Sequence, residues 1–409
     1  MTTVYLKPHK EESLLRFHPW VFSGAIRSIQ LDADYPHAQP QEGEVVQVLD
    51  SNGKILGVGH YQIGSIAVRI LAFGVGELPS DFWQERIRAA YQVRCSLGLI
   101  STETTNSQLS IANNTYRLVH GEGDFLPGLI VDVYADTAVI QAHSIGMHQE
   151  REHICQAIRS VIPEIKHIYY KSEGTLPYKA EIEDRGNRFL IGGDNGMTEV
   201  AEENGLRFKI DWLEGQKTGF FVDQRYNRHL LESYAQGRKV LNMFCYTGGF
   251  SVYAMRGGAL QVDSVDSSAR AIELTDENVH LNFPDDPRHH SHCVDAFRYL
   301  DNMGSDYDLI ILDPPAFAKH RGALRNALQG YKRLNAKAFE RIKPGGILFT
   351  FSCSQVVDKE QFRLAVFSAA AQSGRRVRIL HQLSQPGDHP INIYHPEGEY
   401  LKGLVLWVE

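Results

Sequence analysis

The feature that most constrains the fold of this chain is a regular alternation of strand-like and helix-like segments in its C-terminal half. From about residue 224 onward, short apolar runs at 239–244, 261–266, 309–313 and 347–351 are each followed by a stretch of helical character. Such alternation is typical of a parallel sheet, because a long crossover, usually a helix, joins two parallel strands. We therefore expect an α/β fold with a parallel doubly wound sheet here.

The N-terminal part predicts a small β domain. Strand-like runs lie at 45–49 and 66–71, a short helix is expected at 11–17, and Asn52-Gly53 is a strong hairpin signal. The block after it mixes helices and strands. Its predicted helices are 80–97 and 148–160, and its predicted strands are 116–120, 129–134, 138–142 and 167–171.

A hairpin predicted at 198–202 and 206–211, turned by Asn204-Gly205, opens the last block. A chain of 409 residues has room for several domains, at roughly 100–200 residues each. We predict three, with boundaries at 1–75, 76–190 and 191–409.

Charge and hydropathy exclude several protein classes. The chain has 42 Lys and Arg against 49 Asp and Glu, a net charge of −7, which excludes a histone-like protein that binds nucleic acid through bulk charge. No apolar run approaches the roughly 18 residues that a membrane span needs. The first ten residues lack the apolar core of a signal peptide, so we expect a cytoplasmic protein.

The five cysteines are scattered and include no C-x-x-C pair, and the 18 histidines show no supported ligand spacing, so we assign no metal. Free thiols of a cytosolic protein are mostly packing residues. We expect this of Cys95, Cys155 and Cys293, and a structural or ligand-contact role for Cys245. The histidines of residues 289–292 are expected in a surface loop.

A glycine turn follows the first strand of the predicted parallel sheet. The strand runs into Cys-Tyr-Thr-Gly-Gly-Phe at 245–250, and a helix is predicted at 251–256. Such a turn lets a ligand approach the backbone and presents free N–H groups. Asp266 ends the next strand and could hold both hydroxyls of a ribose, and Asp295 follows a third strand-like element.

Gly248-Gly249 alone indicates no more than a turn, but the two carboxylates at successive strand ends favour a ligand site. The glycines do not match G-x-G-x-x-G, which argues against a dinucleotide and favours S-adenosylmethionine, a ligand without pyrophosphate. The polar segment 215–225 could reach its amino-acid end. The candidate cofactor contacts are Asn242, Phe244, Tyr246, Thr247, Gly248, Asp266, Asp295, Ala296, Gln216, Gln224 and Arg225.

Two further strand ends carry reactive side chains. The strand at 308–312 leads into Asp313-Pro-Pro, whose prolines fix the backbone and present Asp313 at the carboxyl edge of the sheet. The strand at 346–351 ends in Ser-Cys353-Ser. A packing role is common for cysteine. At a strand end between two serines, however, Cys353 is placed to react as its thiolate.

A thiol and a carboxyl group beside a methyl donor indicate methylation of cytosine at carbon 5. That carbon is too weak a nucleophile to take a methyl group unaided. Attack of a thiolate on carbon 6 raises the electron density on carbon 5, and a carboxylic group could hold N3 and the exocyclic amine. We predict Cys353 as the nucleophile and Asp313 as the acid that holds the base.

A basic segment follows the Asp313 turn. Residues 317–343 contain eight Lys or Arg and one acid, Glu340. A charged run is usually a solvated helix face, but here it favours a rim that contacts phosphates. Phe317 and Tyr331 could stack on a base or pack in the core. The candidate RNA contacts are Pro314, Pro315, Phe317, Lys319, Arg321, Arg325, Lys332 and Arg333.

Seven motifs together resemble the ribosomal large subunit methyltransferase I family, a group of class I S-adenosylmethionine-dependent RNA 5-cytosine methyltransferases. The resemblance runs nearly end to end. The motifs are Leu6–Pro8, His18–Phe22, Gly123–Leu129, Gly215–Arg225, Asn242–Phe250, Asp313–Phe317 and Phe351–Ser354.

The resemblance implies an RNA-binding PUA domain, a central α+β domain and a Rossmann-like catalytic domain. It implies a cytosine in large-subunit (23S) ribosomal RNA as target, Cys353 as nucleophile, and a chain that could form a homodimer. One departure concerns product release. Many RNA 5-cytosine methyltransferases carry a second cysteine where this chain has Pro315 and Ala316, so another group must act as the base.

Two alternatives stay open at this point. An RNA guanine N2-methyltransferase would carry an aromatic residue where Ala316 stands, and would need no nucleophile at Cys353. A non-catalytic RNA-binding assembly protein would need only the N-terminal barrel and the basic segment. The combination of Gly248, Asp266 and Asp313 with Cys353 makes the second alternative the weaker.

Overall fold

The chain folds into two compact units in a computed structural model, which describes residues 1–32, 39–100, 113–177, 182, 184, 186–193 and 199–409. Unit 1 comprises residues 1–199, 210–220 and 387–398. Unit 2 comprises residues 200–209, 221–386 and 399–409. The domain boundaries expected at residues 75 and 190 stay predictions. No helix in the described part of the chain is long and apolar enough to cross a membrane.

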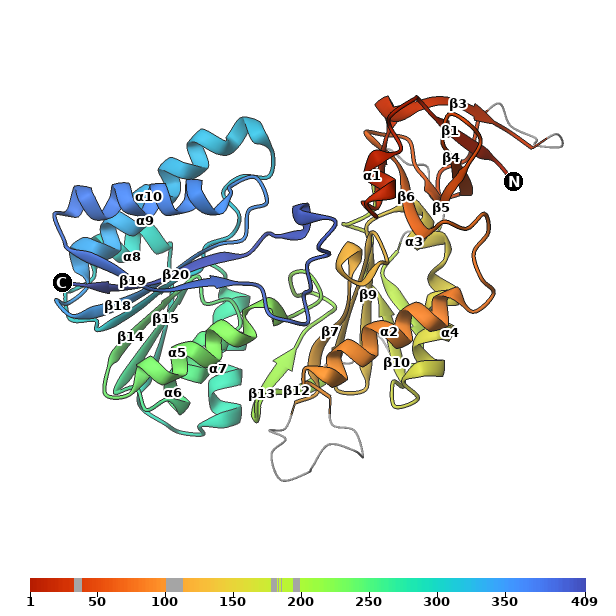
Figure 1. Ribbon diagram of the computed structural model, residues 1–409. Helices are drawn as coiled ribbons and strands as arrows, with labels where there is room; N and C mark the ends of the chain where they lie inside the picture. Colours follow the sequence, from red (N-terminus) through yellow and green to blue (C-terminus); the bar gives the residue numbers. More distant parts are fainter. Residues whose placement is uncertain (33–38, 101–112, 178–181, 183, 185, 194–198) are drawn as a thin grey trace. The chain divides into compact units, whose positions relative to one another are not determined.

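The N-terminal part of unit 1 is a six-stranded sheet in the order β2-β6-β5-β4-β1-β3 (red to orange in Figure 1). Alternate residues of β4, Val46 and Val48, enter a core shared with Val4 and Val68. The expected hairpin at Asn52-Gly53 joins β4 and β5, with Gly53 at φ +87°. The elements are β1 (Thr3–Leu6), α1 (Glu12–Leu15), β2 (Trp20–Phe22), β3 (Ile26–Gln30), β4 (Val45–Leu49), β5 (Ile55–Tyr61) and β6 (Ile66–Phe73).

A five-stranded sheet in the order β11-β10-β9-β8-β7 and three helices follow. Where one helix was predicted at 148–160 there are two, α3 and α4, since Glu150 interrupts the helical run. The elements are α2 (Phe82–Ser96), β7 (Thr115–His120), β8 (Leu129–Tyr134), β9 (Thr137–Ala142), α3 (Ile145–Gln149), α4 (Arg151–Val161), β10 (His167–Tyr170) and β11 (Arg188–Ile191).

A distant segment, residues 387–398, also belongs to unit 1. The fully buried Arg94 forms an ion pair with Asp124 and donates a hydrogen bond to the carbonyl of Asp388. Asp388 in turn accepts the backbone N–H of Arg117. A buried guanidinium with several acceptors thus anchors this segment.

Unit 2 is built on a seven-stranded sheet in the order β16-β15-β14-β17-β18-β20-β19, in which β20 alone runs antiparallel to its neighbours. The expected doubly wound architecture is confirmed. Its strands are β14 (Lys239–Met243), β15 (Gln261–Asp266), β16 (His289–Cys293), β17 (Leu309–Leu312), β18 (Gly346–Ser352), β19 (Val377–Ser384) and β20 (Lys402–Val408).

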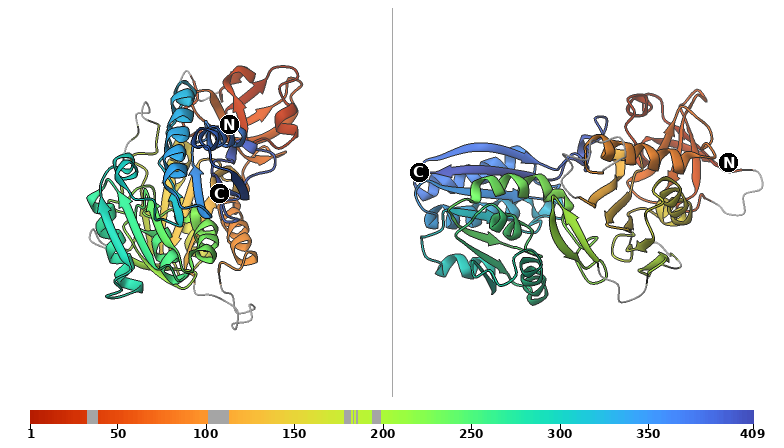
Figure 2. Two further views of the ribbon diagram at one scale, coloured as in Figure 1. Left: turned by 90° about the vertical axis from the view of Figure 1, so that its left-hand side faces the viewer. Right: turned by 90° about the horizontal axis from the view of Figure 1, so that it is seen from below.

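Helices cover both faces of this sheet (Figures 1 and 2). One face carries α8, α9 and α10 over a large apolar core, and the other carries α5, α6 and α7. These helices are α5 (Arg225–Ala235), α6 (Gly249–Arg256), α7 (Ala269–Asn282), α8 (Ala296–Asn302), α9 (Leu324–Arg341) and α10 (Lys359–Ser373). The predicted hairpin forms β12 (Glu199–Glu203) and β13 (Leu206–Ile210), while Thr198 lies outside the described residues.

Two expectations about β16 were wrong. His289–Cys293 is an edge strand and not a loop, because its backbone pairs in parallel with β15 and the ring of His292 reaches the Asp263 carboxylate at 2.8 Å. Cys293 is exposed and not packed, since it ends a strand at the edge of the sheet.

Candidate active site

The parallel register brings the predicted functional residues to one edge of the sheet. Met243 of β14 lies opposite Val265 of β15 on one side and Leu312 of β17 on the other, and Leu312 lies opposite Thr350 of β18. The residues after these positions therefore leave the sheet at the same carboxyl edge. The strand order reverses between β14 and β17, and ligands of such sheets bind in the crevice at that reversal.

The turn after β14 has an unusual backbone. Phe244, Tyr246 and Gly248 all adopt positive φ, at +59°, +49° and +77°. Gly248 is the N-cap of α6, and a Cβ there would stand 2.7 Å from the Cγ2 of Thr275. Positive φ at two residues other than glycine is costly and is found where the surroundings enforce it, often at functional sites.

Asp266 is fixed against this turn. One carboxylate oxygen accepts the N–H of Tyr246 at 3.1 Å and the other accepts the N–H of Ser268 at 2.9 Å. Each carboxylate oxygen can accept more than one hydrogen bond. The group is thus oriented at the turn and can still accept ligand hydroxyls.

Asn242 offers a buried acceptor at the end of β14. Its amide nitrogen donates to the hydroxyl of Ser251 at 2.9 Å, whereas its amide oxygen is buried without a hydrogen-bond partner. Leaving a buried polar atom unpaired costs about 1–3 kcal/mol. Because Asn242 is 1% exposed, its contact with the cofactor stays a prediction.

Four other predicted cofactor residues have clear structural environments. Asp295 caps α8 by accepting the N–H of Arg298 at 3.0 Å, and Ala296 is buried. The carbonyl of Thr247 accepts the side chain of Asn278, and Phe244 packs against the core. Their contact with the cofactor stays a prediction.

The segment 215–225 is divided between the two compact units. Gln216 is exposed and belongs to unit 1, while Gln224 and Arg225 belong to unit 2. Arg225 is fully buried and pairs with Glu203 at 3.5 Å. Its cofactor role, like that of Gln216, stays a prediction.

Asp313 is held by a hydrogen-bond relay. The amide nitrogen of Gln224 donates to its Oδ2 at 3.0 Å, and the side chain of Asn227 donates to the amide oxygen of Gln224 at 2.6 Å. Asn227 thereby fixes which end of Gln224 faces Asp313. Sequence reasoning missed Asn227, although it lies one helical turn after Gln224.

The same surroundings change the acidity of Asp313. Withdrawal from water, strengthened by the charge of Asp223, raises the pKa of Asp313 to about 7, and the hydrogen bond from Gln224 opposes this shift. Near neutral pH the carboxyl group therefore carries its proton for much of the time. A neutral acid can donate a hydrogen bond to a ring nitrogen.

The Cys353 turn is tied to the Asp313 turn. The hydroxyl of Ser354 donates to the carbonyl of Ala318 at 2.7 Å, and the hydroxyl of Ser352 donates to the Tyr331 hydroxyl at 2.9 Å. Cys353 is half-buried between these two anchors. Ser354 thus ties the Cys353 turn to the neighbouring turn, and Ser352 ties it to α9.

The two aromatic residues after Asp313 pack together. Tyr331 is fully buried in the core beneath α9, so it cannot stack on a base. Phe317 is half-buried, with its ring centroid 4.7 Å from that of Tyr331. Pro314 is buried and Pro315 is exposed. Of this group, Pro315 and Phe317 present surface to solvent.

The basic segment divides into paired and exposed cations. Lys337 forms an ion pair with Asp301, and Lys343 pairs with Asp308. Arg333 lies over the ring of Phe297 at 4.4 Å and is exposed. The exposed cations of this segment are Lys319, Arg321, Arg325 and Arg333, with Lys332 half-buried.

Two of the other thiols, Cys155 and Cys245, are buried. Burial raises the pKa of Cys155 and that of Cys245 to about 12. A thiol that stays protonated at neutral pH is a poor nucleophile. The packing expected of Cys155 and the structural option for Cys245 agree with this burial.

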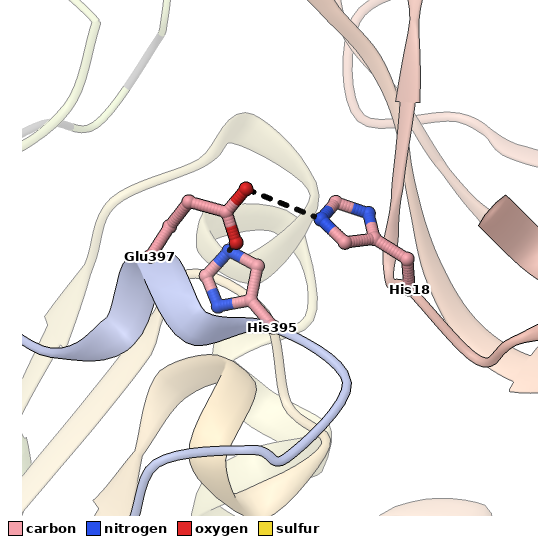
Figure 3. Close-up of side chains that lie close together, drawn as sticks. All are labelled: His18, His395 and Glu397. Atoms are coloured by element: carbon pink, nitrogen blue, oxygen red, sulfur yellow. Dashed lines mark ion pairs between the residues drawn. The ribbon is translucent and has the colours of Figure 1, made fainter.

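One group of described residues brings metal-ligating atoms together: His18, His395 and Glu397, all of unit 1. Figure 3 shows the Glu397 carboxylate between the two rings, 3.6 Å from the Nε2 of His18 and 3.7 Å from the Nε2 of His395. The Nδ1 of His18 accepts the N–H of Trp20. A neutral His18 with this hydrogen bond carries its proton on Nε2, which faces Glu397.

Comparisons with known proteins identify the family and the fold of the chain. Residues 179–392 match the family model described as S-adenosylmethionine-dependent methyltransferase, and residues 4–73 match the PUA-like domain. A solved structure from Streptococcus mutans, described as a candidate SAM-dependent methyltransferase, superposes with a TM-score of 0.80 at 23% identity and full coverage of both chains. A candidate methyltransferase complexed with SAH superposes with a TM-score of 0.82 at 23% identity, again over both whole chains.

The fold and the family match define the chain as an S-adenosylmethionine-dependent methyltransferase with a PUA-like domain. Two curated relatives are ribosomal RNA large subunit methyltransferases I. That of Tolumonas auensis is 40% identical, with 99% of each chain covered, and that of Aeromonas hydrophila is 39% identical, with 99% of this chain and 98% of the relative covered. The chain belongs to the ribosomal RNA large subunit methyltransferase I family.

Proposed function

We propose that this enzyme methylates carbon 5 of a cytosine in large-subunit (23S) ribosomal RNA through a covalent adduct on Cys353. The observation that carries the proposal is the pairing of two strand ends. Cys353 and Asp313 leave neighbouring strands at the carboxyl edge of the sheet, and the Ser354–Ala318 hydrogen bond ties their turns together. A nucleophile and an acid at the carboxyl edge of the sheet are the groups that this reaction needs.

We assign the methyl donor to the turn after β14. Gly248 adopts positive φ at the N-cap of α6, and Asp266 beside it offers acceptors for ribose hydroxyls. S-adenosylmethionine, when bound, supplies an electrophilic methyl group. This chain holds the donor and the base so that the methyl group faces carbon 5.

Cys353 starts the reaction on the base. Its thiolate forms a bond to carbon 6, and the electron pair of the C5=C6 double bond moves toward carbon 5 and the N3 side of the ring. Asp313, in its neutral form, donates a hydrogen bond to N3 and so stabilises the charge that develops there. Carbon 5 is then nucleophilic enough to accept the methyl group.

The product leaves by elimination. Carbon 5 gives up its proton to a base, the electron pair of that C–H bond restores the C5=C6 double bond, and the C6–S bond breaks to return the Cys353 thiolate. Methylation and elimination together consume one methyl donor and release one proton. Pro315 and Ala316 offer no side chain that could take the proton.

We assign RNA phosphates to the exposed cations after Asp313. Lys319, Arg321 and Arg325 are exposed on the chain that leads into α9 and on its first turn. Lysine and arginine at such a rim bind RNA through its phosphates and release counterions. The PUA-like domain would supply further RNA contacts, and the cytoplasmic location and homodimer expected above stay predictions.

A methyl-transfer assay tests the assigned base and atom. Unmodified large-subunit RNA is incubated with labelled S-adenosylmethionine and digested to nucleosides. We expect label in 5-methylcytidine with the wild type and with Cys293→Ser, which removes an exposed thiol at another strand end, and none with Cys353→Ala. Label in a methylated guanosine that survives Cys353→Ala would contradict the proposal.

A further inference from the structure

A buried lysine lies next to the Cys353 turn. Strands β18 and β20 pair antiparallel, and their register places Lys402 opposite Ser352, the residue before Cys353. Lys402 is 5% exposed. A lysine is rarely buried unless its charge is compensated, so its surroundings need a functional or structural explanation.

The ammonium group of Lys402 is bound by the turn itself. Its Nζ donates hydrogen bonds to the carbonyls of Ser354 and Val357, which lie on the C-terminal side of Cys353. Lys402 thus contacts the chain on both sides of Cys353. It lies opposite Ser352 in the strand register and donates hydrogen bonds to Ser354 and Val357. Two backbone carbonyls of the turn therefore face the positive charge of Lys402.

Several charged groups act on Lys402, and the Cys353 thiolate is the first of them after burial. Burial lowers the pKa of Lys402 to about 8, and the charge of a Cys353 thiolate opposes that shift. Glu399 forms an ion pair with Lys359. The other titratable groups coupled to Lys402 or to Cys353 are Asp358 and Tyr331. At pH 7 the ammonium form of Lys402 dominates.

We propose that Lys402 is a positioning residue that holds a positive charge against the Cys353 turn and thereby favours the reactive thiolate. The inference deepens the function proposed above and rests on it for its catalytic meaning. A nearby cation stabilises a thiolate and lets it form at lower pH. The role we assign to Lys402 is to act through Cys353.

The test measures the thiol directly, without RNA or S-adenosylmethionine. Alkylation of Cys353 by iodoacetamide is followed by mass spectrometry from pH 5 to pH 10 in the full chain, and Cys293 serves as the internal exposed thiol. Lys402→Met keeps the length of the side chain and removes the charge. Lys402→Arg keeps the charge.

We expect K402M to raise the midpoint of Cys353 alkylation by about one pH unit, which slows the reaction about tenfold at pH 7. The rate on the high-pH plateau stays unchanged, and K402R follows the wild type. A K402M midpoint equal to that of the wild type overturns the proposal. So does a lower plateau with an unchanged midpoint, because that is the result of a purely structural role.

The wild type provides a second measurement if K402M does not fold. The midpoint of Cys353 should then lie at least about one pH unit below that of Cys293 in the same sample, and equal midpoints overturn the inference. Alkylation needs no methyl transfer. Methyl transfer that survives Cys353→Ala would refute the proposed function while leaving the low midpoint of Cys353, so the two failures are distinguishable.

Discussion

The hydroxyl of Ser354 donates a 2.7 Å hydrogen bond to the carbonyl of Ala318, and this bond joins the turn that carries Cys353 to the turn that carries Asp313. Both partners are buried. A buried hydrogen bond of this kind contributes about 1 kcal/mol and, more importantly, fixes geometry. The mechanism proposed for Cys353 requires that geometry, because the thiol and the acid would have to face the same base.

Replacement of the acid should change both activity and stability. Asp313→Asn should lower the rate of methyl transfer by about 100-fold, in the range typical for a lost acid or hydrogen-bond donor in the transition state. The folded-state pKa of Asp313, about 7, lies above its ordinary value of 3.8, so ionisation is disfavoured in the folded protein. The Asp313 carboxyl group therefore contributes most to the free energy of unfolding below pH 4, and this contribution is lost as the pH rises toward 7.

Urea unfolding of the wild type and D313N across pH 4–7 checks this sign. The free energy of unfolding of the wild type should fall relative to that of D313N over this window. A difference that stays constant with pH would contradict the raised pKa of Asp313.

Loss of the Gln224 hydrogen bond should shift the titration of Asp313. Gln224→Leu removes the donor whose bond lowers the pKa of Asp313, so that pKa should rise further. Because the neutral acid is the form that donates to N3, we expect activity to extend to higher pH, with about a threefold higher rate at pH 7.5 if the pKa rises by about one unit. Rate–pH profiles of wild type and Q224L measure the shift, and identical profiles would refute the relay.

Gly248 should not tolerate a side chain. Gly248→Ala imposes a Cβ 2.7 Å from Thr275 at φ +77°, and should cost about 1–3 kcal/mol and weaken binding of S-adenosylmethionine. Gly258→Ala is the matched control, because Gly258 has a similar φ of +83° but no Cβ contact closer than 3.5 Å. Thermal unfolding compares the stability of the two variants, and titration calorimetry compares their affinity for S-adenosylmethionine. An equal loss of affinity in both variants would contradict the assignment of the cofactor to the turn after β14.

Exposed and paired cations of the basic segment should differ in RNA binding. The double variant Arg321→Ala/Arg325→Ala removes two exposed charges and should weaken RNA binding. If each arginine contacts one phosphate, the slope of log binding constant against log salt concentration should become shallower by about 0.7 to 0.9 for each. Lys337→Ala removes a cation that is paired with Asp301. Filter binding over a range of salt concentrations should give K337A an RNA affinity near that of the wild type. Equal losses of affinity in K337A and in the double variant would contradict a specific role of the exposed cations.

Much of this fold followed from the sequence, because strands in a parallel sheet leave a strong pattern. The run at 239–244 became β14 and the glycine turn fell where predicted, since buried strands need apolar runs and the following helix needs a turn. The edge strand β16 was missed, because His289–Cys293 lacks apolar residues and is recognisable only by its pairing with β15.

The residues that support the candidate site were harder to predict than the position of its two strand ends. Asp313 and Cys353 stand at strand ends that the sequence marks with prolines and serines. Lys402, by contrast, is 49 residues from Cys353 in sequence and reaches the turn only through the register of β20 on β18. The return of residues 387–398 to unit 1 likewise depends on buried contacts with Arg94 that no local pattern announces.

The most direct test of the central claim is the detection of the covalent adduct itself. Large-subunit RNA that contains 5-fluorocytosine keeps fluorine at carbon 5, so elimination is blocked after methyl transfer and the protein stays bound to carbon 6. With S-adenosylmethionine present, the wild type and Cys293→Ser should form an adduct that survives denaturing electrophoresis, and Cys353→Ala should form none. Efficient methylation of ordinary RNA without any adduct on the fluorinated RNA would contradict Cys353 as the nucleophile.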